Sequence, residues 1–147
     1  MSENMIYEND LITVEYEPSE IPWLKVFINR NVREFSECTI DEKAEIFRVL
    51  DVTEKLMLSF FNQKIRTSEK SSEERIFSSE ERIFNSSVCK INIASFGNML
   101  PRVHWHIMAR FEDDSYFPET MWGKKQRESE LILPSFDIFF KQLSEAL

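Results

Sequence analysis

A run of alternating side chains between Arg102 and Arg110 constrains the fold of this chain more than any other feature. Within RVHWHIMAR, every second residue is apolar, namely Val103, Trp105, Ile107 and Ala109. Successive side chains of a β-strand point to opposite faces of the sheet, so this period of two predicts a strand. One face would pack on a core. The other would present His104 and His106, the chain's two histidines, beside an arginine.

Two histidines that lie two residues apart on one strand face allow three interpretations. They can be polar surface, they can share a metal ion, or they can act on a phosphate, since imidazole serves as nucleophile, base or acid near neutral pH. A closed zinc site needs about four ligands, and Cys38 and Cys89 are too far apart to form a C-x-x-C pair. The sequence therefore signals no metal and no cofactor, and the neighbouring arginine favours phosphate chemistry.

Composition limits the classes of protein to which the chain can belong. Its 147 residues, 42% of them hydrophobic, predict one globular domain over residues 1–147. The net charge of −8 disfavours non-specific binding to nucleic acid or to an anionic membrane. We see no apolar span and no secretory signal, and two isolated cysteines suit a reducing compartment, so we expect a cytoplasmic protein. A small anionic ligand would need locally concentrated positive charge, as around Arg102, Arg110, Lys124 and Lys125.

Hydrophobic patterning predicts an α+β fold, in which an antiparallel sheet has helices on one face. Strand-like runs cover residues 5–8, 11–17, 24–28 and 88–95, in addition to the histidine strand. Thr39 and Glu42 have the spacing of a capping box, which predicts a long helix from there to about residue 64. Its core stripe is predicted to include Ala44, Phe47, Leu50, Met57 and Phe61. Pro134 can open a final helix with a phenylalanine-rich apolar stripe.

One segment does not fit this plan. The heptad SSEERIF at residues 71–77 is repeated without change at 78–84. Two copies are too few for a solenoid. The repeat can extend the long helix or form a solvated excursion. We interpret residues 67–87 as an inserted connection that carries a tandem duplication and no chemistry; the alternative is a helix that binds a partner.

Residues 90–98 and 100–108, with the sequences KINIASFGN and LPRVHWHIM, resemble the signature region of the histidine triad (HIT) superfamily. Its pattern is His-φ-His-φ-His-φ-φ, where φ is apolar, preceded by a strand and a loop that run from an asparagine to a glycine. The segment from Arg110 to Gly123 is similar to a bacterial branch of HIT-like proteins. The resemblance covers nearly the whole chain except residues 67–87. It implies a HIT-like antiparallel five-stranded sheet with one long helix and a C-terminal helix, assembled as a homodimer.

The resemblance also implies a chemistry. HIT enzymes are nucleotidyl hydrolases and transferases whose middle histidine attacks an α-phosphate and forms a nucleotidyl-imidazole intermediate. That position is His104 here, and His106 stands where the family's third histidine assists at the phosphate and the leaving group. Asn98 falls near the family's loop glutamine, and backbone N–H groups around Gly97 would add phosphate donors. Glu17 falls near the carboxylate that holds the ribose hydroxyls. The implied ligand is a nucleotide, with adenine or another purine as its base.

The chain departs from the family at Arg102, which occupies the first triad position. Its planar fork can bind a phosphate oxygen or pair with a neighbouring carboxylate. The histidine that usually precedes the third strand is absent from Pro22-Trp23-Leu24-Lys25, and the loop before the triad has few glycines. Two functions follow. One is a HIT-type hydrolase or nucleotidyltransferase acting on a nucleoside phosphoramidate, a dinucleoside polyphosphate or a similar adenylyl compound. The other is a catalytically weak or inactive nucleotide-binding or regulatory module. Retention of His104 favours the enzyme.

Overall fold

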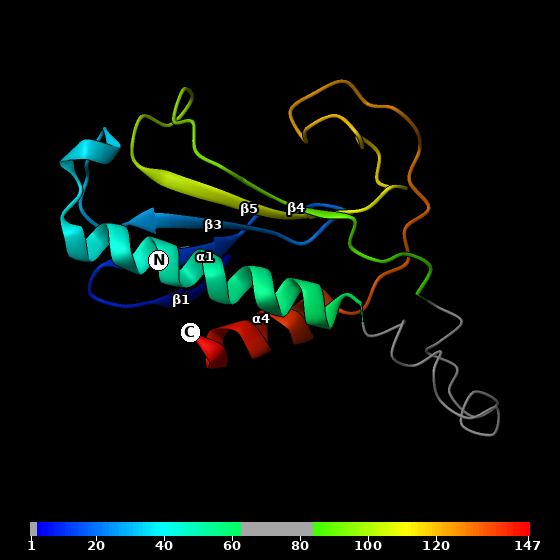
Figure 1. The fold of residues 1–147 in the computed structure, drawn as a ribbon, viewed down its shortest axis with the longest axis horizontal. Helices are drawn as coiled ribbons and strands as arrows, with labels where there is room; N and C mark the ends of the chain where they lie inside the picture. The colour runs from blue at the N-terminus through cyan, green and yellow to red at the C-terminus, as the bar shows by residue number, and fades with distance from the viewer. Residues whose placement is uncertain (1–2, 63–83) are drawn as a thin grey trace.

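The computed structural model describes residues 3–62 and 84–147, and its centre is one antiparallel sheet (Figure 1). The strand order is β1-β2-β3-β5-β4. The bounds are β1 (Met5–Glu8), β2 (Ile12–Tyr16), β3 (Trp23–Ile28), β4 (Lys90–Ala94) and β5 (His104–Arg110). This confirms the predicted α+β class and the five-stranded antiparallel sheet.

Two α-helices, α1 (Ile40–Phe60) and α4 (Phe136–Ala146), lie side by side on one face of the sheet (Figure 1), and a short 3-10 helix, η1 (Phe35–Glu37), precedes α1. The predicted capping box is present at the start of α1. Thr39 Oγ1 accepts a hydrogen bond from the Glu42 backbone N–H at 3.0 Å, and Glu42 Oε1 accepts one from the Thr39 N–H at 2.7 Å. These two bonds satisfy backbone donors that the first helical turn leaves without partners.

The face of α1 that packs on the sheet differs in part from the predicted stripe. Leu50, Met57 and Phe61 are buried as predicted, but Ala44 is exposed and Phe47 is 55% exposed. The buried stripe is rotated about the helix axis relative to the predicted one. Its buried residues outside the predicted set recur at helical spacing and are Ile46, Val49, Thr53 and Phe60. The prediction was therefore wrong for the first turns of the helix and correct for its second half.

The second helix, α4, attaches through aromatic rings. Ser135 caps its N-terminus by accepting from the Ile138 N–H at 3.4 Å, one residue after the predicted opening at Pro134. Phe139 is fully buried and its ring centroid lies 5.0 Å from that of Phe61. The Phe140 ring stacks on Tyr16 of β2 at 4.7 Å. The helix thus packs on both α1 and the sheet.

The predicted alternation of β5 is confirmed. Val103, Ile107 and Ala109 are 6% exposed or less, and Trp105 is half-buried, on the face that the two helices cover. The alternate residues of β5 therefore point to the opposite face of the sheet. The antiparallel register of β3 and β5 places Phe27 opposite His104 and Lys25 opposite His106 on that face.

The duplicated heptads lie outside the described residues, except for Phe84 at the end of the second copy. The predicted insertion at 67–87 and the single domain over 1–147 therefore stay predictions. No helix in the described part of the chain is both long and apolar enough to cross a membrane.

Candidate functional site

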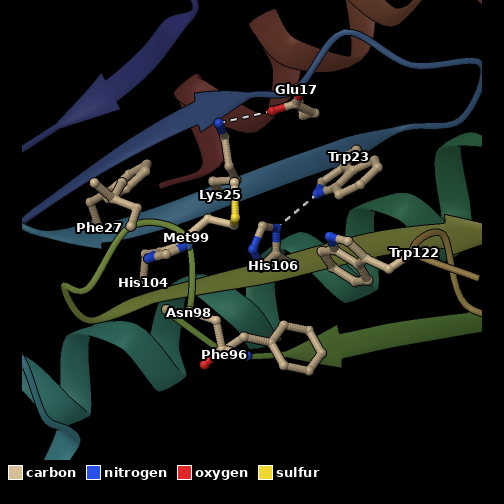
Figure 2. A pocket seen from close by; sticks show the side chains of 12 residues that line it. Glu17, Trp23, Lys25, Phe27, Phe96, Asn98, Met99, His104, His106 and Trp122 are labelled. Carbon is tan, nitrogen blue, oxygen red and sulfur yellow. Dashed lines mark hydrogen bonds and ion pairs between the residues drawn. The ribbon is translucent and has the colours of Figure 1, made fainter.

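A cavity of about 530 Å³ opens on the face of the sheet opposite the helices (Figure 2). Its walls come from β2–β3, from β5, from the loop after β4 and from the segment after β5. The lining residues are Glu17, Trp23, Lys25, Phe27, Phe96, Gly97, Asn98, Met99, Leu100, His104, His106 and Trp122.

His104 has its tautomer set by a backbone carbonyl. Its Nδ1 lies 2.8 Å from the Arg102 carbonyl oxygen. A carbonyl oxygen only accepts, so Nδ1 must carry the proton and donate it, and Nε2 of the neutral ring keeps its lone pair. The ring stacks on Phe27 with centroids 5.0 Å apart and is 7% exposed. His104 is thus arranged as a nucleophile.

His106 has the opposite tautomer. The indole Nε1–H of Trp23 donates to His106 Nδ1 at 3.0 Å, and since indole nitrogen is a donor only, Nδ1 must be the acceptor and Nε2 must carry the proton. Burial is the main cause that lowers the pKa of His106 to about 4; the electrostatic effects of His104 and Lys25 act in the same direction, and that of Glu17 opposes them. The ring is therefore neutral at pH 7.

The two rings form a complementary pair. Their centroids are 5.1 Å apart, and in Figure 2 the nitrogen of His106 that Trp23 does not contact lies on the side of the ring that faces His104. His104 offers a lone pair, and His106 offers an N–H donor. A phosphate between them would meet a nucleophile at phosphorus and a hydrogen-bond donor at one of its oxygens.

Aromatic side chains enclose His106. The Trp122 ring contacts His106 at 4.9 Å, Trp23 at 5.3 Å and Phe96 at 5.0 Å, all edge to face. Phe96 is 60% exposed and Trp122 is 49% exposed. These two rings therefore form a rim on which a planar base or an apolar leaving group can stack.

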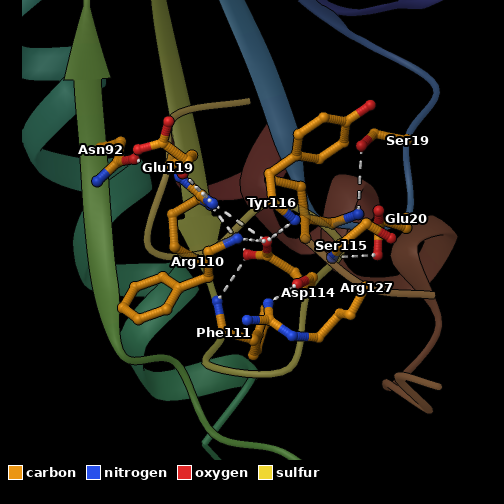
Figure 3. A network of polar contacts seen from close by, with 12 residues as sticks. Ser19, Glu20, Asn92, Arg110, Phe111, Asp114, Ser115, Tyr116, Glu119 and Arg127 are labelled. Atoms are coloured by element: carbon orange, nitrogen blue, oxygen red, sulfur yellow. Dashed lines mark hydrogen bonds and ion pairs between the residues drawn. The ribbon is translucent and has the colours of Figure 1, made fainter. Parts of the chain in front are cut away.

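A buried ion pair holds the segment that brings Trp122 to the cavity (Figure 3). Arg110 and Asp114 are 2% and 0% exposed and are joined by two hydrogen bonds of 2.9 and 3.1 Å. Arg110 also donates to Asn92 Oδ1 of β4 at 2.9 Å and to the Glu119 carbonyl at 2.7 Å. The guanidinium thus ties β4 and β5 to the loop that leads to Trp122.

Both carboxylate oxygens of Asp114 accept hydrogen bonds. Its carboxylate accepts from the backbone N–H groups of Phe111, Tyr116 and Phe117 at 2.8 to 3.1 Å, in addition to Arg110. Burial raises the pKa of Asp114, but the bonds from Arg110 and from these N–H groups together hold it below its ordinary value. The carboxylate therefore stays charged and fixes the turn that follows β5.

Most of the sequence-predicted site residues meet in this one cavity. His104, His106, Glu17, Gly97 and Asn98 all line it. Gly97 has φ of +86°, in the left-handed region that favours glycine, so the turn after β4 depends on this residue. Their roles in phosphate and ribose binding stay predictions.

Arg102 lies differently from the other predicted residues. Its guanidinium donates a hydrogen bond to the Ile28 carbonyl and lies 5.2 Å from the centroid of the Phe27 ring. It is absent from the residues that line the cavity. Its predicted contact with a phosphate therefore stays a prediction.

None of the four cations that the sequence suggested, Arg102, Arg110, Lys124 and Lys125, is among the residues that line the cavity. Arg110 is buried against Asp114, and Lys125 pairs with Glu128 at 2.8 Å. The cavity instead holds Lys25, whose Nζ lies 2.9 Å from Glu17 Oε1. Sequence reasoning missed Lys25, although a lysine within the apolar run of β3 was a signal of a polar face.

Trp23 and Trp122 were also missed as site residues. Trp23 is in the segment from which the family's histidine is absent. This absence could have indicated that another side chain in the segment contributes to the site. Trp122 lies in the segment from Arg110 to Gly123 that entered the family resemblance, but the resemblance gave this side chain no role at the site. Within residues 3–62 and 84–147, no group of three or more His, Cys, Asp or Glu side chains could hold a metal ion.

Neither a protein-family model nor a curated protein matches the chain. Solved structures do match it. A histidine triad protein from Sinorhizobium meliloti has a TM-score of 0.61 and 20% identity, over 97% of this chain and 88% of that one. One from Bradyrhizobium japonicum gives 0.56 and 20%, over 98% and 89%, and one from Marinobacter aquaeolei gives 0.54 and 18%, over 97% and 90%. At a sequence identity of 20% or less, this similarity shows the fold alone. The chain therefore has the fold of histidine triad proteins.

Proposed function

We propose that this chain is a nucleotide-binding HIT-type hydrolase or nucleotidyltransferase that acts on the α-phosphate of a nucleotide compound. The observation that supports the proposal best is the pair of opposite tautomers. The Arg102 carbonyl leaves Nε2 of His104 with a lone pair, and Trp23 leaves Nε2 of His106 with a proton. Polar surface histidines have no need of two separate partners that fix them in complementary forms.

The proposed reaction has two steps. First, Nε2 of His104 bonds to the α-phosphorus while the bond to the leaving group breaks; the leaving group departs with the electron pair and takes a proton from water. The Nδ1–H of the resulting imidazolium stays bonded to the Arg102 carbonyl, which stabilises the positive charge. Second, water attacks phosphorus, Nε2 leaves with its electron pair and the proton of the water goes to solvent. Attack by another hydroxyl gives transfer instead of hydrolysis.

His106 acts in this scheme as a donor and not as an acid. Since its pKa is about 4, the ring is neutral at pH 7, and a neutral imidazole N–H gives up its proton far less readily than an imidazolium. Its N–H would stabilise negative charge on a phosphate oxygen as the bond to His104 forms. Asn98 and the backbone at Gly97 also line the cavity and are proposed as further phosphate contacts.

The nucleoside would occupy the two ends of the cavity. Glu17 is 38% exposed, so its carboxylate can accept hydrogen bonds from ribose hydroxyls. The exposed rings of Phe96 and Trp122 suit the flat surface of a purine. We keep the purine preference as part of the proposal, because stacking by itself tolerates any base.

A homodimer is proposed as well. Large apolar side chains are exposed on the outer side of α1 and on the edge strand β4, with exposed fractions of 84% for Ile40, 55% for Phe47, 40% for Leu58 and 42% for Ile93. A two-fold interface is the commonest way to cover such a surface. Light scattering at micromolar concentration checks this, and a monomer would contradict it.

The experiment that tests the function is a single turnover with a nucleotide that is radiolabelled at the α-phosphate. We expect protein-bound label that is stable in base, labile in acid and absent from His104→Asn. Tight reversible binding without covalent label would instead support the nucleotide-binding or regulatory module. Absence of both label and binding across adenine and guanine nucleotides would contradict both functions.

A further inference from the structure

We propose that Lys25 is the cation that binds the phosphate in this cavity. The inference rests on the proposed function and adds a residue to it. Nothing in the histidine motif points to Lys25, which lies on a different strand.

The position of Lys25 is the first argument. In the antiparallel register, Lys25 of β3 lies directly opposite His106 of β5, on the same face of the sheet. Side chains that are paired in this way have Cβ atoms about 5 Å apart. The flexible four-carbon stem of a lysine therefore lets the amine reach a phosphate held between His104 and His106.

The partner of Lys25 is the second argument. Its Nζ is turned toward Glu17 at 2.9 Å (Figure 2), and the two side chains are 22% and 38% exposed. Ion pairs at such partly exposed positions contribute little to stability, so the amine can exchange the carboxylate for a phosphate at small cost. The exchange would also release the Glu17 carboxylate to accept the ribose hydroxyls. Lys25 thus connects the phosphate end of the cavity to its ribose end.

Charge balance is the third argument. Among the described residues that line the cavity, Lys25 is the one lysine or arginine and Glu17 is the one carboxylate. The neighbouring cavity contains Arg33, but it also contains Glu34 and so adds no net charge. Lys25 is therefore the cation that this lining offers to the negative charge of a bound phosphate.

The test replaces the amine and compares charged with uncharged ligands. Lys25→Leu removes the charge, Lys25→Arg keeps it, and Lys55→Leu is the matched control, because Lys55 forms an equivalent ion pair with Asp51 at 2.8 Å on α1. Binding of adenosine 5′-phosphoramidate and of adenosine is measured by calorimetry in a His104→Asn background, which prevents turnover. We expect Lys25→Leu to weaken the phosphoramidate roughly tenfold or more while adenosine loses no affinity. Lys25→Arg and Lys55→Leu should stay within about threefold of the parent.

Unchanged phosphoramidate affinity in Lys25→Leu, or equal losses for phosphoramidate and adenosine, would overturn the role of Lys25.

The two proposals fail separately. If label forms on His104 and Lys25→Leu binds the phosphoramidate as well as its parent does, Lys25 is not the phosphate cation. The proposed enzymatic function then remains supported. If no label forms but Lys25→Leu loses affinity for the phosphoramidate alone, the binding role of Lys25 stands and the covalent mechanism falls. A parent protein that binds no phosphoramidate overturns both.

Discussion

Trp23 of β3 donates its indole N–H to Nδ1 of His106 on β5 at 3.0 Å, so one strand sets the tautomer of a histidine on its neighbour. The rings also meet edge to face, with centroids 5.8 Å apart. Trp23 lies in the segment from which the HIT family's own histidine is missing. The His106 ring is therefore oriented by an indole, a donor that has a single possible role in the hydrogen bond.

Trp23→Phe should lower kcat roughly five- to tenfold, because it removes one hydrogen bond and leaves His106 free to exchange its tautomers. Nitrogen-15 NMR of the His106 ring should show the loss of the fixed Nε2–H form. The control is Trp105→Phe on the helix-covered face of β5, where the indole nitrogen is buried and has no hydrogen-bond partner among the described residues. Equal losses in the two variants would contradict the orienting role of Trp23.

His104→Asn should abolish the covalent intermediate and keep nucleotide binding, because the amide retains hydrogen-bonding capacity but has no nucleophilic nitrogen. His106→Ala should still form the intermediate, but about 10²-fold more slowly, as expected for the loss of one donor to the phosphate. Rapid-quench kinetics with labelled substrate measure both. Formation of protein-bound label in His104→Asn would show that another residue is the nucleophile.

Folding stability should fall as the pH falls from about 6.5 to about 4. The pKa of His106 is lowered from its ordinary 6.5 to about 4, so in this window the unfolded chain binds a proton that the folded chain does not. The contribution is complete above pH 6.5 and lost below pH 4, and its size is about 3 kcal/mol. Urea unfolding across this range measures it.

The matched variant for this measurement is His106→Gln, which should lose most of the slope between pH 6.5 and 4. Glu42 acts in a lower window: its hydrogen bond to Arg30 lowers its pKa from 4.5 to about 2, so its contribution is lost only as the pH falls through that range. An unchanged slope in His106→Gln would assign the pH dependence to other groups.

Asp114→Asn should destabilise the fold by about 3–5 kcal/mol, because it leaves Arg110 buried without its anion. Glu128→Gln is the control, since it breaks the exposed pair with Lys125 in the same segment, and the carboxylate there is 89% exposed. The control should cost less than about 1 kcal/mol. Urea unfolding separates the two, and similar values would show that burial does not distinguish these ion pairs.

The sequence predicted best what depends on neighbouring residues. The period of two in β5 and the capping box at Thr39 and Glu42 are set by backbone geometry within a few residues, and both are confirmed. The phase of the α1 stripe was wrong at Phe47 because an apolar residue at helical spacing can face either a core or an exposed surface. Local periodicity does not tell these two apart.

The site was predicted in part for the same reason. The histidine pair is contiguous in the sequence, whereas Lys25 and Trp23 reach it through the β3–β5 register. Trp122 reaches it through a loop whose path depends on the buried pair of Arg110 and Asp114. A sequence pattern does not specify which strands pair or where a loop returns, so these contributions became visible only in three dimensions.

The alternation of β5 has a consequence for how the site persists. A shift of one residue in the pairing of β3 with β5 would turn His104 and His106 toward the helices and would bring Ile107 and Ala109 into water. The shifted register would lose the burial of these core residues and would destabilise the fold, whether or not substrate is present. The hydrophobic pattern of β5 therefore also fixes the orientation of the imidazoles. The register that buries Ile107 and Ala109 is the same register that places both histidines in the cavity.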